Sequence, residues 1–286
     1  MANGADSLLT VEYVSLLEFL YDRVQGDGLL AWQDQATAAT RFSLDLSEVE
    51  LFALEQGLLP ARYQRNRASI SVQGQLLLFR STVAVIGCGG LGGYVIEQLA
   101  RIGVGRIVVI DPDLFEEHNL NRQLFSSLAS IGQAKVTVAR ERISLINPAV
   151  SVIAMQAAFG RTNGRELLQG AHIVVDALDG ITVRLELAEL CETLQLPLVH
   201  GAIAGWYGQV LTQFPGEKTV QSIYRNGAEG IGAGAESGNP ACTPAVIASL
   251  QVAEVCKIIL KEGTLLRNRW LCVDLQEMAF DEVTLK

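Results

Sequence analysis

The stretch that decides the fold is Val83–Asp113, which has the sequence VAVIGCGGLGGYVIEQLARIGVGRIVVIDPD. It opens with a short apolar run that is typical of a buried strand. The glycine-rich turn Gly87–Gly92 follows, and the apolar residues within 94–102 have helical spacing. A second apolar run, 106–110, ends at Asp111. We therefore expect a strand, a turn, a helix and a parallel strand, in that order.

The glycines of this unit indicate that it binds a phosphate. Gly87 permits the tight turn after the strand, Gly89 lets the backbone approach an anion, and Gly92 lets the helix pack closely on the sheet. The helix N-terminus then faces the phosphate, and Asp111 is placed to bind ribose hydroxyls. A plain packing unit is disfavoured because glycines, strand, helix and Asp111 agree. ATP and a dinucleotide such as NAD both satisfy the pattern.

Length and composition favour one large α/β domain with a smaller appendage. The chain has 286 residues, of which 49% are hydrophobic, so it can bury a large core. Its formal charge of −9 and sequence pI near 4.9 disfavour a nucleic-acid-binding surface, which needs clustered cations. No uninterrupted apolar run of about 18 residues and no signal peptide are evident. We expect a cytoplasmic protein without a membrane partner.

The cysteines are odd in number and contain no CxxC pair, which argues against a disulfide framework or a zinc knuckle. They are Cys88, Cys191, Cys242, Cys256 and Cys272. Cys242 directly follows a glycine-rich stretch, 224–241, for which we expect a mobile functional loop. Because Cys242 also precedes an apolar helix, 245–260, the helix dipole would favour its thiolate. A buried structural cysteine and a reactive thiol both remain open.

The first 58 residues are expected to form a helical extension, with the main domain spanning 59–286. Apolar spacing indicates helices before Gly57, and Ser47 with Glu50 has the pattern of a capping box. A DNA-reading helical module is disfavoured because the segment is acidic, so packing or partner docking is the preferred role. The stretch 59–67 that follows is basic, and either a solvated face or a phosphate-binding arm fits it.

Two further groups of residues are predicted at the carboxyl ends of the strands, where open α/β sheets bind ligands. Arg122 and Lys135 flank a polar loop that follows Asp111. Asp179 closes a buried strand, where its carboxylate either holds Mg²⁺ or caps the next helix. Of the histidines, His172 and His200 are expected to be satisfied core residues, and His118 lies in the polar loop without an evident partner.

These motifs together resemble the HesA/MoeB/ThiF group of ubiquitin-activating-enzyme-like adenylyltransferases. The resemblance extends from about Arg62 to the C-terminus. It rests, in order, on RYQRN (62–66), GCGGLG (87–92), Asp111, NLNRQ (119–123), GQAK (132–135), Asp179 and SLQVAEVCK (249–257). The resemblance implies a Rossmann-like, doubly wound, mostly parallel sheet. It also implies ATP- and Mg²⁺-dependent adenylation of the C-terminal carboxylate of a small ubiquitin-like carrier protein or peptide, with release of pyrophosphate, in sulfur transfer or cofactor biosynthesis.

The resemblance also assigns roles to single residues. Phosphate and ribose contacts are implied for Gly87, Gly89, Gly90, Asp111, Asp113, Asn119 and Gln123. Catalytic roles are implied for Arg65, Arg122, Lys135 and Asp179, with Asp179 holding Mg²⁺. Separately, the place of Cys242 after the glycine-rich stretch makes it a weaker candidate for a covalent step. In relatives, the arginine that matches Arg65 reaches the neighbouring subunit's site, so a homodimer is implied. A carboxylate is ionised at neutral pH, and the reaction therefore needs no general base.

The sequence departs from the family pattern in three places. The positions of a CxxC pair found in many relatives hold Ser222–Arg225 here, so we predict no zinc. Gly180 replaces the usual asparagine after the magnesium aspartate, and the helical extension lies outside the resemblance. Two other functions compete with adenylation. An NAD-dependent oxidoreductase is disfavoured because it would leave Arg65, Arg122 and Lys135 without a role. A catalytically inactive, partner-binding relative is disfavoured because it would not need to retain these residues.

Overall fold

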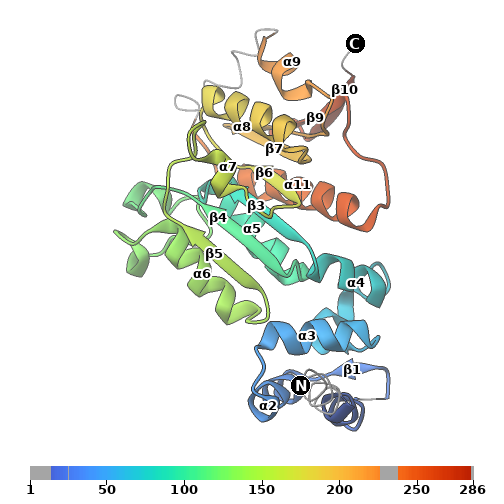
Figure 1. The fold of residues 1–286 in the computed structure, drawn as a ribbon. Helices are drawn as coiled ribbons and strands as arrows, with labels where there is room; N and C mark the ends of the chain where they lie inside the picture. The colour runs from blue at the N-terminus through green and yellow to red at the C-terminus, as the bar shows by residue number, and fades with distance from the viewer. Residues whose placement is uncertain (1–13, 25, 226–237, 285–286) are drawn as a thin grey trace.

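A computed structural model describes residues 14–24, 26–225 and 238–284 (Figure 1). The helices of the N-terminal extension lie at one end of the molecule, and α9, β9 and β10 lie at the other (Figure 1). The α/β layers with the central sheet lie between them. Two thirds of the expected glycine-rich segment, residues 226–237, lie outside the described residues, and the prediction of a loop there is untested.

The main sheet has eight strands in the order β10-β9-β8-β7-β6-β3-β4-β5. The strands are β3 (Thr82–Ile86), β4 (Arg106–Ile110), β5 (Ser151–Met155), β6 (Ile173–Asp176), β7 (Leu198–Ala204), β8 (Tyr207–Gln213), β9 (Arg269–Asp274) and β10 (Ala279–Thr284). Strands β7, β6, β3, β4 and β5 are parallel, and β8, β9 and β10 extend the sheet in antiparallel fashion. The mostly parallel sheet confirms the predicted fold class.

Helices cover both faces of the sheet because the central strands are apolar on both sides. Val83 and Val85 of β3 pack into one cluster with α5, α6 and α11, while Ala84 and Ile86 pack into a second cluster with α8 and α9. The helices are α5 (Gly90–Ile102), α6 (Lys135–Ile146), α7 (Gly164–Leu167), α8 (Ile181–Leu194), α9 (Thr219–Arg225) and α11 (Cys242–Leu260). The sheet is therefore doubly wound, as predicted.

The order of the strands creates a topological switch point. From β3 the chain moves outward to β4 and β5, and it then returns to the other side of β3 to form β6 and β7. The crossovers after β3 and β6 therefore diverge and leave a crevice beyond the carboxyl ends of these strands. Ligands of open α/β sheets bind in such a crevice.

Helix α11 is long and apolar enough to cross a membrane by length and composition alone. In the folded chain it contacts β7, β8 and α5, and Ile247, Ala248 and Val255 are fully buried there. This packing is that of a core helix in an α/β layer.

The N-terminal extension has its own small core. It comprises a helix at residues 14–21, β1 (Leu29–Leu30), α2 (Trp32–Phe42) and α3 (Leu46–Glu55). The short strand β1 pairs with β2 (Leu59–Pro60), which leads through the 3₁₀ helix η1 (Ala61–Asn66) to α4 (Val72–Phe79). Leu29, Leu54, Tyr63 and Phe79 share one apolar cluster, so the extension packs directly against the start of the main domain.

Two local predictions are wrong. The capping box of α3 uses Asp45 and Glu48, and Glu50 is fully buried in an ion pair with Arg62. His172 is exposed, and its Nδ1 accepts a hydrogen bond from the Thr82 N–H at 3.2 Å. The residues of β10 are mostly exposed, and this strand therefore lacks the apolar alternation that predicts strands.

Candidate active site

A pocket of about 660 Å³ opens at the switch point. The carboxyl ends of β3, β4 and β6 form its floor, and the loops after them form its walls. Its lining includes the predicted site residues Gly87, Gly89, Gly90, Asp111, Asp113, Arg122, Gln123, Lys135 and Asp179. Residues up to 92 positions apart in the sequence, from Gly87 to Asp179, therefore meet around one cavity.

The glycine turn brings the backbone of β3 against β6 and α5. Gly87 has φ +105°, and a Cβ placed on it would lie 2.5 Å from the Ala177 carbonyl oxygen. A Cβ on Gly92 would lie 1.8 Å from the Gly87 carbonyl oxygen. Gly89 is the N-cap of α5 and has no side chain to occupy the first N–H groups, so these groups are free to bind an anion.

Asp111 stabilises the glycine turn through hydrogen bonds to the backbone. Its side chain is buried, with Oδ2 accepting the Cys88 N–H at 2.6 Å and Oδ1 accepting the Asp113 N–H at 2.8 Å. Burial raises the pKa of this carboxyl above its ordinary value, and the two N–H groups and Lys135 oppose that rise. Asp111 thus fastens the glycine turn to the end of β4, while the exposed carboxylate at this position belongs to Asp113.

Lys135 and Arg122 form one cationic wall of the pocket, and Arg184 also lines the cavity. Lys135 begins α6, is nearly buried, and its Nζ lies 2.9 Å from Asp113 Oδ2. Arg122 donates to the His118 carbonyl at 3.1 Å and to Asn121 Oδ1 at 2.8 Å. Both cations face the cavity, where they can neutralise the charge of bound phosphates.

The opposite wall offers a single free carboxylate. Asp179 is exposed at the edge of the pocket and forms no hydrogen bond or ion pair with any described residue. No cluster of three or more metal-ligating side chains is present in the described part of the chain. A magnesium ion held by one carboxylate and by the phosphates of a nucleotide fits this donor set.

Three predicted residues lie outside the pocket lining. Arg65 is exposed in η1, and Cys242 is exposed as the first residue of α11. Asn119 is buried, and its Oδ1 accepts the Glu116 N–H at 2.9 Å, so it caps the 3₁₀ helix η2 (Glu117–Asn119). In this structure Asn119 shapes the loop that carries Arg122, and its side chain does not face the cavity.

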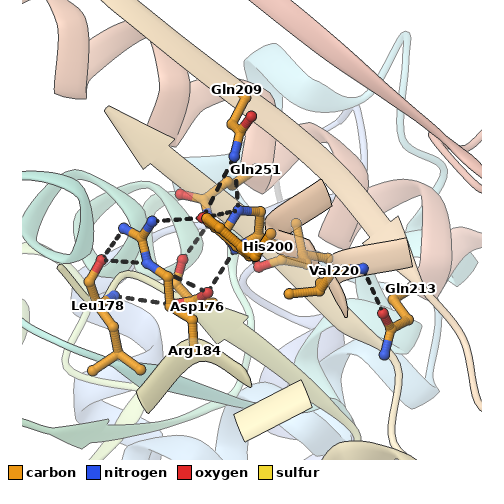
Figure 2. Close-up of polar contacts among 10 residues, drawn as sticks. Asp176, Leu178, Arg184, His200, Gln209, Gln213, Val220 and Gln251 are labelled. Carbon is orange, nitrogen blue, oxygen red and sulfur yellow. Dashed lines mark hydrogen bonds and ion pairs between the residues drawn. The ribbon is translucent and has the colours of Figure 1, made fainter. Parts of the chain in front are cut away.

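Sequence reasoning missed a buried polar network beside the pocket (Figure 2). Its members are Asp176, Arg184, His200, Gln209, Tyr224 and Gln251. His200 is fully buried and lies 2.6 Å from Asp176. Burial lowers the pKa of its imidazole, and the Asp176 carboxylate opposes that shift, so His200 is neutral near pH 7. The available signal was a set of polar residues within otherwise apolar strands.

The chain belongs to the ThiF family, whose model matches residues 63–286. It is similar to the SAMP-activating enzyme E1 of Haloferax volcanii, with 34% identity over 226 residues that cover 78% of this chain and 84% of the relative. It is also 34% identical over 239 residues to the sulfur carrier protein adenylyltransferase of Thermus thermophilus, covering 79% and 87% of the two chains. The match to the adenylyltransferase and sulfurtransferase MOCS3 of Anopheles gambiae covers 52% of that longer protein.

Solved structures share the fold. A structure of Escherichia coli MccB with ATP has a TM-score of 0.67 at 22% identity and covers 88% of this chain and 82% of its own. A structure of PaaA has a TM-score of 0.65 at 20% identity, and the match covers 78% of this chain and 72% of the PaaA chain. The family and the fold class expected from the sequence motifs are thus both confirmed.

Proposed function

We propose that this protein uses ATP to adenylate the C-terminal carboxylate of a small ubiquitin-like sulfur carrier protein. The observation that carries this function is the pocket at the switch point, in which the glycine turn, Arg122, Lys135 and Asp179 face one cavity. The lining contains no histidine, tyrosine, serine, threonine or cysteine among the described residues. This composition suits a reaction that needs charge neutralisation and no proton transfer.

In the proposed reaction, a carboxylate oxygen of the carrier forms a bond to the α-phosphorus of ATP. The bond from that phosphorus to the bridging oxygen breaks, and its electron pair leaves with pyrophosphate. Negative charge grows on a centre that is already anionic, so fixed cations lower the barrier. Lys135 and Arg122 neutralise the phosphates, and the N–H groups at the start of α5 bind them.

Magnesium is part of this proposal. Asp179 would hold the ion, with the remaining ligands coming from phosphate oxygens and water. When bound, the ion would stabilise the negative charge on the leaving pyrophosphate. The free Asp179 carboxylate supports this assignment, because a carboxylate without a protein partner beside a phosphate site is available as a ligand.

We further propose a homodimer in which Arg65 acts on the partner's site. Arg65 is exposed and lies outside the pocket of its own chain, as expected for a residue that serves another subunit. A second copy would place an additional guanidinium beside the triphosphate. Cys242 is proposed, more narrowly, to accept the acyl group from the adenylate, forming a thioester as the acyl–oxygen bond breaks and AMP and the thiol proton are released. Its thiol is exposed at the N-terminus of α11.

The test is ATP–pyrophosphate exchange with a small carrier protein that ends in Gly-Gly, with a carrier lacking its last glycine as control. We expect carrier-dependent exchange that requires Mg²⁺ and disappears with the truncated carrier. Thermal shift with ATP and with NAD provides a second measurement. Stabilisation by NAD alone, without exchange, would refute the proposal. Mass spectrometry of the enzyme with ATP and carrier tests the covalent role of Cys242. If Cys242→Ala gave the same adducts as wild type, Cys242 would have no part in the mechanism.

A further inference from the structure

The buried network behind the pocket forms a directed chain of hydrogen bonds (Figure 2). Asp176 Oδ2 lies 2.6 Å from His200 Nδ1, so we assign the proton to Nδ1 and leave Nε2 as an acceptor. The Tyr224 hydroxyl lies 3.1 Å from Nε2 and donates to it. Arg184 Nη1 in turn donates to the Tyr224 oxygen at 2.8 Å. Every polar atom along this path therefore has a partner while His200 is neutral.

Both ends of this chain meet at the backbone of one residue, Leu178. Asp176 Oδ1 accepts the Leu178 N–H at 3.0 Å. Arg184 donates to the Leu178 carbonyl oxygen from Nε at 3.1 Å and also from Nη2. The N–H and the carbonyl of Leu178 are thus held by the two ends of the same network. Leu178 immediately precedes Asp179, the free carboxylate of the pocket.

We propose that Arg184, Tyr224 and His200 are positioning residues that hold Asp179 in place by clamping the backbone on both sides of Leu178. The inference rests on the proposed function, because it gives Asp179 the role of magnesium ligand. Tyr224 and His200 lie outside the pocket lining, whereas Arg184 belongs to it, and the role requires no contact with the nucleotide. The three residues come from α9, β7 and α8, so the clamp joins two helices and a strand to the pocket wall.

Burial explains why such a network can hold a position. Asp176 and His200 are fully buried, and Arg184 is 5% exposed, so a lost hydrogen bond cannot be replaced readily by water. A geometric error of about 1 Å at a reacting group can reduce the rate by about a hundredfold. Asp179 itself has no other partner among the described residues, so its backbone is what positions it.

The decisive variant is Tyr224→Phe, which removes one hydroxyl and retains the ring. We expect exchange activity to fall about tenfold, with a higher Mg²⁺ concentration needed for half-maximal rate and an unchanged KM for the carrier. In an Asp179→Asn background the same change should cost less than about twofold, since the residue it positions is already lost. Equal losses in both backgrounds would overturn the inference.

A readout independent of activity is amide hydrogen exchange at Leu178, measured in wild type and in Tyr224→Phe. We expect faster exchange at this amide in the variant, while the amides of β4 keep their protection. Unchanged exchange at Leu178 would overturn the inference, even if no carrier supports activity. If the wild-type enzyme showed no ATP–pyrophosphate exchange with any carrier, that result would instead count against the proposed function alone.

Two further variants guard against a simple folding defect. Tyr207→Phe makes the same chemical change at a half-exposed residue of β8 and should leave both readouts unchanged. Arg184→Lys keeps the charge but cannot donate to Leu178 and Tyr224 with one planar fork. It should reproduce both the Mg²⁺ effect and the faster Leu178 exchange. A folded Arg184→Lys protein with wild-type values in both measurements would contradict the inference.

Discussion

The amine of Lys135 is nearly buried and lies 2.9 Å from the exposed carboxylate of Asp113. The Lys135 N–H also donates to the Asp113 carbonyl at 3.0 Å, so backbone and side chain together fix this lysine at the start of α6. A buried ammonium with one carboxylate partner is held facing the pocket at little conformational cost. Phosphate oxygens can therefore add to its hydrogen bonds without reorganising it.

Replacing this lysine tests its catalytic role. Lys135→Met keeps most of the apolar stem and removes the charge. We expect carrier-dependent exchange to fall at least about a hundredfold, since a preorganised charge-stabilising group contributes about that factor. Steady-state exchange kinetics check this outcome, with circular dichroism to show that the variant is folded. Activity within a few-fold of wild type would remove Lys135 from the proposed mechanism.

Mixing two strongly impaired variants tests the action of Arg65 across a dimer. Arg65→Ala and Asp179→Asn, coexpressed, should form heterodimers with one intact site, because one chain supplies Asp179 and its partner supplies Arg65. Random pairing predicts recovery of about a quarter of wild-type exchange activity. The control pairs Arg65→Ala with the double variant, which cannot form an intact site and should keep only the residual activity of the single variants. No recovery in verified heterodimers would show that Arg65 does not act in trans.

The close contact at the glycine turn predicts a strong effect on stability. Gly92→Ala would bring a Cβ to 1.8 Å from the Gly87 carbonyl oxygen, so backbone must move. We expect a loss of about 3 kcal/mol or more in the free energy of unfolding. Gly160→Ala is the matched control, since its Cβ would meet nothing closer than 4.0 Å and should change stability by less than about 0.5 kcal/mol. Urea denaturation measures both.

The buried ion pair of Glu50 with Arg62 fixes the helical extension to η1. Arg62→Ala would leave the fully buried Glu50 without its cation and should destabilise the protein by about 3–5 kcal/mol near neutral pH. Burial already raises the pKa of Glu50, and removing Arg62 raises it further. The deficit should therefore shrink as pH falls and Glu50 becomes protonated. Arg67→Ala, at an exposed site, serves as control, and equal losses from both would contradict this role.

His200 predicts a further pH dependence. Its pKa is lowered by burial, and it faces Asp176, Arg184 and Tyr224. Between the folded and unfolded pKa values the unfolded chain binds the extra proton, so wild-type stability should fall as pH drops below about 6.5.

The comparison with His200→Gln isolates this group, because other titrating groups are shared. The stability advantage of wild type over the variant should narrow by at most about 1.4 kcal/mol per pH unit in that range. Chemical denaturation at several pH values between 8 and 5 would measure this narrowing. The narrowing is expected to begin only below a pH of ~6.5. A constant difference would show that His200 does not titrate on unfolding.

Short-range patterns predicted the part of the fold that local chemistry controls. The strand, glycine turn and helix of Val83–Asp113 are formed as expected, since apolar runs and glycines encode them directly. The pocket residues followed because parallel strands end at the same sheet edge. The two local errors have a common origin, because Ser47 and His172 were assigned from local patterns that contacts with neighbouring segments overrode.

The sequence by itself determined the family, the doubly wound sheet and the cluster of cations around a glycine turn, because these depend on motifs of a few residues and their order. Only the tertiary structure decided which carboxylates have partners. Asp111 accepts backbone N–H groups and Asp113 pairs with Lys135, whereas Asp179 has no partner among the described residues. It also decided that His200 and Tyr224 join Arg184 behind the pocket. Such contacts link residues distant in the chain, and their partners depend on burial and packing that no local pattern records.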